Sequence, residues 1–449
     1  MGHIKLDNGL HKFSSLGEKL KRNYAVIINF LFLLLLVCFS RDTLITSTRW
    51  NFYVVSIGLT FVCYSYFFLY LLSCQLKVKI GKDSVIIAGL IALCVFLTMI
   101  VNQKFELMDF YFLMVVSIAL LFCLTVDFST FCRSFVAVMV FLCVYSIICT
   151  YLLRGIWFSP NSHFPIIFNS SKIPFYDFGF AFVVANKTYL RNFGVFREPG
   201  VYQVFINIAL IIELFVIRSK RGWVKVAVVA VLGFTVLTTF SISGCVTAFI
   251  VMVTYIIARI SRSTHKIRAV IIVSAVGFAC VGLVAVLYAK NNNFHWELVS
   301  AFNKIVHSND SLSARMGSIV GNLQSWVQAP LFGRGPDTVL HLVKHNTSTT
   351  SGIFAIYGTL VGLVHLLLFF GFAYRVDRRL WVRIVLFVAL MLSINNEMLF
   401  TNQFLWVLSF SFFMRNNSDD SDKLFRWIQS IIKNIRKPGA RISADTLDQ

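Results

Sequence analysis

Residues 352–374 read GIFAIYGTLVGLVHLLLFFGFAY, an apolar stretch followed by Arg375, in which the lone His365 is predicted to pack between helices. A helix needs about 20 mostly apolar residues to cross a bilayer. Such stretches recur about 12 times, so the sequence predicts an all-α integral membrane protein with about 12 transmembrane helices. The stretches lie near 24–39, 52–74, 84–102, 108–126, 133–153, 199–217, 223–240, 242–258, 269–289, 352–374, 380–396 and 401–414.

The composition excludes an ordinary soluble domain. Hydrophobic residues make up 57% of the 449 positions and charged residues only 14%, whereas about 25% is usual in soluble domains. The ten cysteines lie in or beside apolar segments, and the two long polar segments described below contain none, which argues against a disulfide framework there. No cleavable signal peptide and no internal repeat are recognisable, so an inverted-repeat transporter gains no support.

The formal charge of +21 reflects membrane topology. With the amino terminus placed in the cytoplasm, 28 of the 41 Lys and Arg residues fall in the segments predicted to face inward. The bias is strongest in short loops such as 218–225 and 375–383, where the positive-inside rule is most dependable. Both termini are therefore predicted to be cytoplasmic and both long loops to face outward. A nucleic-acid partner is not expected, because the charge is not gathered on one soluble face.

These assignments divide the chain into seven parts. They are a cytoplasmic amino terminus (1–23), five spans (24–153), a first large periplasmic loop (154–198), four spans (199–289), a second large loop (290–351), three spans (352–414) and a cytoplasmic tail (415–449). In the tail, apolar residues from Leu424 to Ile435 recur at helical spacing among basic residues, which predicts an amphipathic helix on the lipid bilayer.

Both large loops end in recognisable structural patterns. In the first, Pro199 fits the first position of a helix, and Glu198 then lies at the positive end of the helix dipole. In the second, a helix is predicted from Ser311 or Ser313 to a stop at Pro330. After a tight turn, a second helix is predicted to begin at Asp337, with His341 and His345 on one face.

Three kinds of side chain in these loops could carry chemistry: four arginines, two histidines and one glutamate. Arginine binds phosphate through two parallel hydrogen bonds, and histidine can accept a proton near neutral pH. The simpler interpretation is that the basic residues contact lipid headgroups. For Arg334, the position between two glycines indicates a structural role. The histidine pair has no suitable third ligand, so no metal and no cofactor are predicted. The residues are Arg191, Arg197, Arg315, Arg334, His341, His345 and Glu198.

Three motifs resemble the O-antigen polymerase (Wzy-type) and O-antigen ligase superfamily of bacterial surface-polysaccharide glycosyltransferases. The segment RNFGVFREPG (191–200) resembles the one that opens a span in that family. SAR (313–315) followed by APLFGRG (329–335) is similar to its second periplasmic-loop motif, and HN (345–346) to the pair before its next Gly-containing helix. The likeness covers about residues 189–405 in the family's order. FSISG (240–244) departs from it, lacking the arginine often found there.

The resemblance implies a GT-C-like, metal-independent, inverting glycosyltransferase. Its substrates would be oligosaccharides linked to undecaprenyl diphosphate, as donor and acceptor, at the periplasmic face of the inner membrane. By the same resemblance, Arg191 and Arg315 would hold the diphosphate and His345 would be the general base. Arg197, Glu198, Arg334, His341 and Asn346 would bind substrate, and a chain-length regulator protein would be a partner.

Two other functions stay open. A ligase would transfer the finished chain to lipid A-core by the same chemistry. A lipid-linked oligosaccharide flippase or transporter would need polar residues deep in several spans, whereas the spans here are nearly free of charge. The Glu-Pro-Gly motif and the polar segment 395–397 favour the polymerase.

Overall fold

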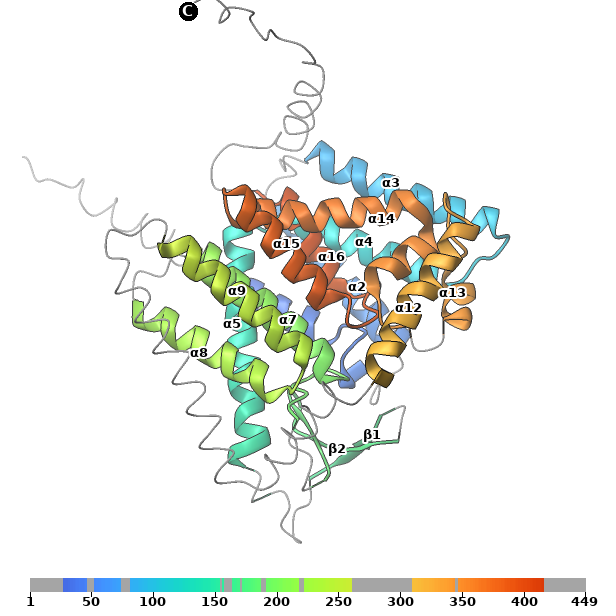
Figure 1. Cartoon of the computed structure of the whole chain (residues 1–449). Helices are drawn as coiled ribbons and strands as arrows, with labels where there is room; N and C mark the ends of the chain where they lie inside the picture. Colours follow the sequence, from blue (N-terminus) through green and yellow to red (C-terminus); the bar gives the residue numbers. More distant parts are fainter. Residues whose placement is uncertain are drawn as a thin grey trace, which may run out of the picture.

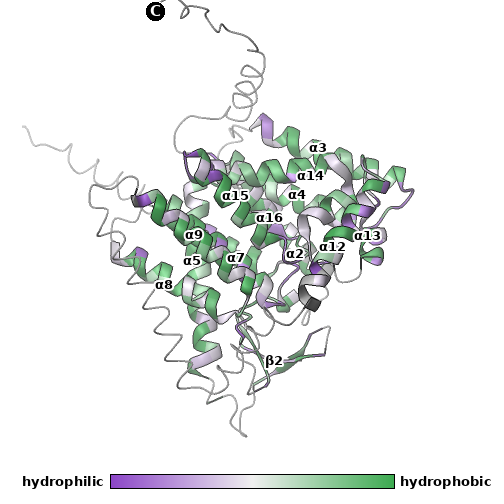
Figure 2. Ribbon diagram, viewed as in Figure 1, coloured by the Kyte–Doolittle hydropathy of each residue, from purple (hydrophilic) through white to green (hydrophobic). Residues whose placement is uncertain are grey.

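The computed structural model is a helical bundle with a small sheet at one edge (Figure 1). It describes residues 27–46, 52–73, 81–153, 156, 164–169, 172–186, 191–217, 222–260, 309–343 and 346–415. The predicted span 269–289 and the predicted amphipathic tail helix lie outside these ranges. Figure 2 shows apolar residues along most helices and hydrophilic ones mainly at the helix ends and around α12 and α13.

Every other predicted span coincides with a helix. These helices are Ile27–Cys38, α2 (Phe52–Ser73), α3 (Lys82–Val101), α4 (Leu107–Thr125), α5 (Phe128–Ile147), α7 (Pro199–Ile211), α8 (Gly222–Thr238), α9 (Ile242–Ile260), α14 (Thr349–Val376), α15 (Leu380–Ile394) and α16 (Gln403–Phe410). Short π or 3₁₀ turns extend α5, α7 and α16: η2 (Ile148–Leu152), η3 (Ile212–Val216) and η4 (Ser411–Phe413). Within the described ranges, six helices are long and apolar enough to cross a membrane, which indicates a multi-pass membrane protein.

The all-α prediction is wrong in the first large loop. It contains an antiparallel sheet of β1 (Ile166–Phe168), β2 (Pro174–Asp177) and β3 (Phe182–Val184), in that order. Short runs of aromatic and β-branched residues favour strands, and the intervening turns use left-handed backbone at Lys172 and Gly179. The Phe182 N–H donates to the Gly194 carbonyl (2.8 Å), which ties the sheet to the segment before α7.

Helix α7 lies at the centre of the bundle. Pro199 occupies its first turn, as predicted, and Glu198 is its extended N-cap residue. Apart from Gly200, the residues of α7 are buried, and the helix packs against α5, α8, α9 and α15. Because it is enclosed on all sides, the residues just before it are held in a fixed position relative to four neighbouring helices.

Contacts between loops place both large loops at one end of the bundle. The Thr349 hydroxyl, at the start of α14, donates to the Glu397 carbonyl (2.5 Å), and the Glu397 carboxylate lies 3.8 Å from Arg197 before α7. We call this the loop end. Several arginines meet at the opposite end of α14, where the guanidinium of Arg375 donates to the Met414 carbonyl and that of Arg379 to the Ala258 carbonyl. The described parts of the two long loops and the basic loop 375–383 thus lie at opposite ends of α14, as the charge pattern predicted for these segments.

The two helices predicted in the second loop are present as α12 (Asn309–Gln328) and α13 (Pro336–Leu342). Helix α12 packs against α14. However, α13 has only seven residues and ends at Leu342, so the helix is shorter than predicted. It carries His341, whereas His345 lies outside the described residues, so the predicted pairing of the two histidines stays a prediction.

Candidate functional site

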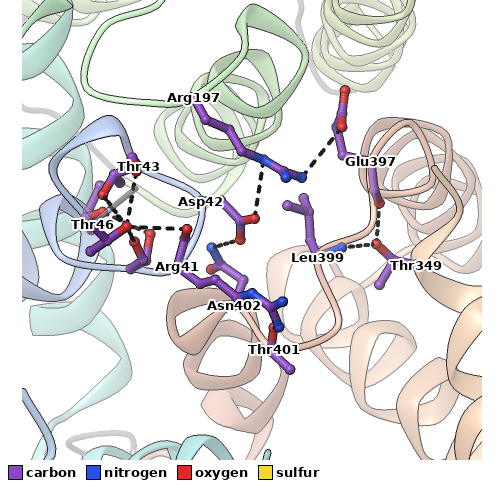
Figure 3. Close-up of polar contacts among 12 residues, drawn as sticks. Arg41, Asp42, Thr43, Thr46, Arg197, Thr349, Glu397, Leu399, Thr401 and Asn402 are labelled. Atoms are coloured by element: carbon purple, nitrogen blue, oxygen red, sulfur yellow. Dashed lines mark hydrogen bonds and ion pairs between the residues drawn. The ribbon is translucent and has the colours of Figure 1, made fainter. Parts of the chain in front are cut away.

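A group of charged side chains at the loop end surrounds Arg197 (Figure 3). Its Nε lies 3.5 Å from an Asp42 carboxylate oxygen, and its Nη2 lies 3.8 Å from a Glu397 oxygen. Asp42 follows the first helix, Arg197 precedes α7 and Glu397 follows α15. We call these three residues the Arg197 clasp, because one guanidinium joins three segments that are far apart in the sequence.

Backbone and amide contacts fix the Asp42 side of the clasp. The Arg197 N–H donates to the Asp42 carbonyl (3.0 Å), and the Leu44 N–H to the Val195 carbonyl (2.9 Å). The other Asp42 carboxylate oxygen accepts from Nδ2 of Asn402 (2.9 Å). Asp42 is only 4% exposed, so its charge is stabilised by these two partners rather than by water.

Gly200 fixes the Glu397 side. A Cβ atom at Gly200 would lie 2.6 Å from Oε1 of Glu397, so a residue larger than glycine would displace this carboxyl from its place at the start of α7. The Glu397 N–H donates to the Ile394 carbonyl, and Thr349 binds the Glu397 carbonyl, which together hold the turn after α15. The Glu-Pro-Gly motif therefore positions a carboxyl from another segment as well as starting a helix.

The environment changes the acidity of two groups of the clasp. Burial alone would lower the pKa of Arg197, but the surrounding carboxylates of Asp42, Glu397 and Glu198 raise it, so the guanidinium stays charged. Burial and the negative charge of the neighbouring Glu198 carboxyl raise the pKa of Glu397 to about 8, although Arg197 acts in the opposite direction.

The Arg197 guanidinium keeps capacity for a further anion. Both ion pairs are longer than the roughly 2.7–2.9 Å of a direct hydrogen bond between arginine and a carboxylate. The side chain is 37% exposed, and Glu198 next to it is exposed as well. An arginine in this state is held in place by its neighbours while part of its side chain stays exposed.

Arg191 lies at the same segment but against a different neighbour. Its Nε donates to the Thr239 carbonyl (3.1 Å) in the turn between α8 and α9, and the rest of its side chain is partly exposed. The next residue, Asn192, is buried and binds Ser146 and Thr238 through its amide. This anchors the backbone that carries Arg191.

Arg315 is partly exposed on α12. Asn346, predicted to bind substrate, exchanges amide hydrogen bonds with Asn322 of α12 at 3.0 and 2.7 Å. Its amide therefore joins α12 to the start of α14, which is a structural use. His341 is exposed in the last turn of α13, and His345 lies outside the described residues. No contact that joins Arg191, Arg197 and Arg315 is found in the part of the chain that the structure describes.

The turn that contains Arg334 has a scaffold role. Helix α14 is interrupted at Gly358 (φ 81°, ψ −175°), and the turn 330–335 fills the break. The Arg334 N–H donates to the Ala355 carbonyl (2.9 Å), the Gly335 N–H to that of Ile356 (3.1 Å), and the Thr359 N–H to that of Pro330 (2.8 Å). The Arg334 side chain instead binds Gln328 of α12. We call this backbone joint the Gly358 splice.

The sequence did not identify Asp42 or Glu397 as site residues. Glu397 gave a signal, since it is an acidic residue between two short apolar stretches, but its partner could not be inferred. His365 is packed as predicted, buried with its ring 4.8 Å from that of Phe369.

Among the described residues, no group of three or more His, Cys, Asp or Glu side chains could hold a metal ion. No protein-family model matches the sequence, and no curated protein matches it.

Proposed function

We propose that this protein is a GT-C-like glycosyltransferase that polymerises a bacterial surface polysaccharide from repeat units carried on undecaprenyl diphosphate. It would work at the periplasmic face of the inner membrane, with both termini in the cytoplasm and about 12 spans. The observation that carries the proposal is the Arg197 clasp, a partly exposed arginine fixed by three segments at the loop end of an apolar bundle. It belongs to the motif on which the family resemblance rests.

The proposed reaction is a single displacement. A hydroxyl oxygen of the acceptor sugar attacks the anomeric carbon of the donor, and the bond from that carbon to the diphosphate oxygen breaks. The bonding electrons leave with the diphosphate, and the hydroxyl proton passes to the base. The family resemblance gives His345 this role, and Arg191 and Arg315 that of binding the diphosphate, where charge develops in the transition state.

Further features support this assignment. Arg191 and Arg315 are partly exposed, and each is carried by an anchored element. Arg191 lies on the segment before α7 and donates to the turn between α8 and α9, and Arg315 lies on helix α12, which packs against α14. Apolar helices stand behind the loop end, which suits a substrate whose carrier is an isoprenoid chain in the bilayer. Arg334 and Asn346 serve structural contacts in this arrangement, so we assign them no substrate.

A strain that lacks the gene tests the proposal directly. A polymerase mutant should keep one repeat unit on lipid A-core and lose longer chains, whereas a ligase mutant should accumulate long chains on the carrier lipid. An unchanged surface glycan would contradict both functions.

Complementation with His345→Ala then tests the base. We expect membrane insertion at the wild-type level, no long-chain glycan, and accumulation of the single lipid-linked unit. The amount of protein in isolated membranes serves as the control. A normal chain-length ladder from this variant would remove the role of His345.

A further inference from the structure

The Arg197 clasp contains more acidic than basic groups. Around one guanidinium stand the carboxyls of Asp42, Glu397 and Glu198. Arg41, nearby in sequence, donates from Nη1 to the Thr401 hydroxyl (2.9 Å). If all three carboxyls were ionised, the site would repel the anion that an exposed arginine is suited to bind.

Two of these carboxyls are neighbours. Glu198 and Glu397 interact electrostatically, and the charge on one carboxyl disfavours ionisation of the other, so one of them keeps a proton more readily than an isolated carboxyl would. Glu198 is exposed, whereas Glu397 is 12% exposed and its carboxyl occupies the space left by Gly200. The buried member has the greater cost of ionisation, so Glu397 holds the proton.

We propose that Glu397 is protonated while the donor is bound, and that its neutral carboxyl leaves the Arg197 guanidinium available to the donor's diphosphate. Glu397 is thus a positioning residue that acts through Arg197, and Glu198 keeps the proton on it. This inference rests on the proposed function, and it adds Arg197 as a third arginine at the leaving group.

The pH dependence follows from the raised pKa of Glu397, about 8. Below that pH the carboxyl is neutral and the diphosphate binds. Above it, a new negative charge 3.8 Å from Nη2 of Arg197 competes with the diphosphate. If binding requires the proton, the dissociation constant rises toward tenfold per pH unit above the pKa, the limit for one linked proton.

The test measures binding of undecaprenyl diphosphate to the purified full-length protein in detergent from pH 6.5 to 9.5. Glu397→Gln keeps the carboxyl neutral, so its dissociation constant should rise less with pH than that of the wild type. Comparison of the two proteins cancels the titration of the ligand itself. Glu198→Gln removes the neighbour that retains the proton, so its rise should begin at lower pH than in the wild type.

The matched control is Glu106→Gln. Glu106 is another buried carboxyl at the loop end, where it accepts the N–H of Asp337 (2.7 Å) outside the clasp. This variant should follow the wild-type curve. If the role of Glu397 were purely structural, Glu397→Gln would instead lower the folded fraction at all pH values. The dissociation constant of the folded protein, isolated by size-exclusion chromatography, would then depend on pH as in the wild type.

Two outcomes overturn the inference: the same pH dependence in Glu397→Gln as in the wild type, or a loss of the pH dependence in Glu106→Gln as well. The conversion of lipid-linked repeat units to polymer by the wild-type protein, measured in parallel, tests the proposed function separately. If polymer forms and the Glu397→Gln curve is unchanged, only the inference fails. If no polymer forms, the proposed function fails.

Discussion

The segments 191–200 and 329–335 both carry the family resemblance, yet the structure uses them differently. The first presents charged side chains, with Arg197 held between Asp42 and Glu397 and still partly exposed. The second is joined to α14 by its backbone, where Gly333 and Gly358 leave no room for a side chain. A titratable contact can respond to a ligand or to pH, whereas a backbone joint can only hold a shape. The clasp is therefore the better candidate for function and the splice for support.

The largest expected effect comes from breaking the splice. Gly358 has a backbone conformation that is nearly restricted to glycine, and a Cβ there would lie 2.1 Å from the Leu331 carbonyl oxygen. Gly358→Ala should cost about 3 kcal/mol or more and remove most of the folded protein. Thermal melting in detergent measures this. Gly89→Ala is the control, because nothing lies within 4 Å of that position on α3, and it should melt near the wild type.

The next effect concerns the arginines that we propose to bind the diphosphate. Arg191→Ala and Arg315→Ala should each lower the rate of polymer formation by about 10²-fold or more, with folding unchanged. The assay uses purified protein and lipid-linked repeat units. Full activity with lysine at both positions would indicate that charge suffices and that no bidentate contact is made.

A smaller effect should follow from loosening the clasp. Asp42→Asn removes the carboxylate beside Arg197 but keeps an oxygen for Asn402. Since Arg197 is 37% exposed, water screens the pair, and a double-mutant cycle with Arg197→Gln should give a coupling free energy of about 1 kcal/mol. Urea unfolding or melting measures it. A coupling near zero would show that the clasp does not hold these segments together.

The smallest effect is expected at the splice arginine. Arg334→Ala loses a side-chain contact with Gln328 and keeps the backbone N–H that binds Ala355. Stability should change by less than about 0.5 kcal/mol, and the polymerisation rate by less than about twofold. A tenfold loss of rate with intact folding would instead return Arg334 to the substrate site.

Much of the architecture could be predicted because its causes are local. The windows at 84–102 and 108–126 coincide with α3 and α4, and Pro199 begins α7 because its missing N–H costs nothing at a helix start. The sheet at 166–184 was missed, because strands of three or four residues leave too weak an alternation to read. The reach of α13 was overestimated, since no strong stop follows Leu342 in the sequence.

The site was harder to predict, because its partners are remote in the chain. Arg197 and Glu198 were identified as candidates from their own chemistry, but Asp42 and Glu397 were not. Nothing near Asp42 reveals that Asn402, 360 residues away, will donate to its carboxylate. Similarly, nothing in the sequence distinguishes Gly358 from other glycines in helices. The close approach of the turn that begins at Pro330 explains why this position must be glycine.

The sequence by itself determined that apolar helices dominate and that basic loops stand at one end and long loops at the other. Both follow from bilayer thickness and charge, which act on each segment separately. Only the tertiary structure decided which arginine lies between carboxylates and which is held by its backbone. That choice depends on how whole helices pack, because a buried charge takes whatever partner the neighbouring helix brings within a few ångströms.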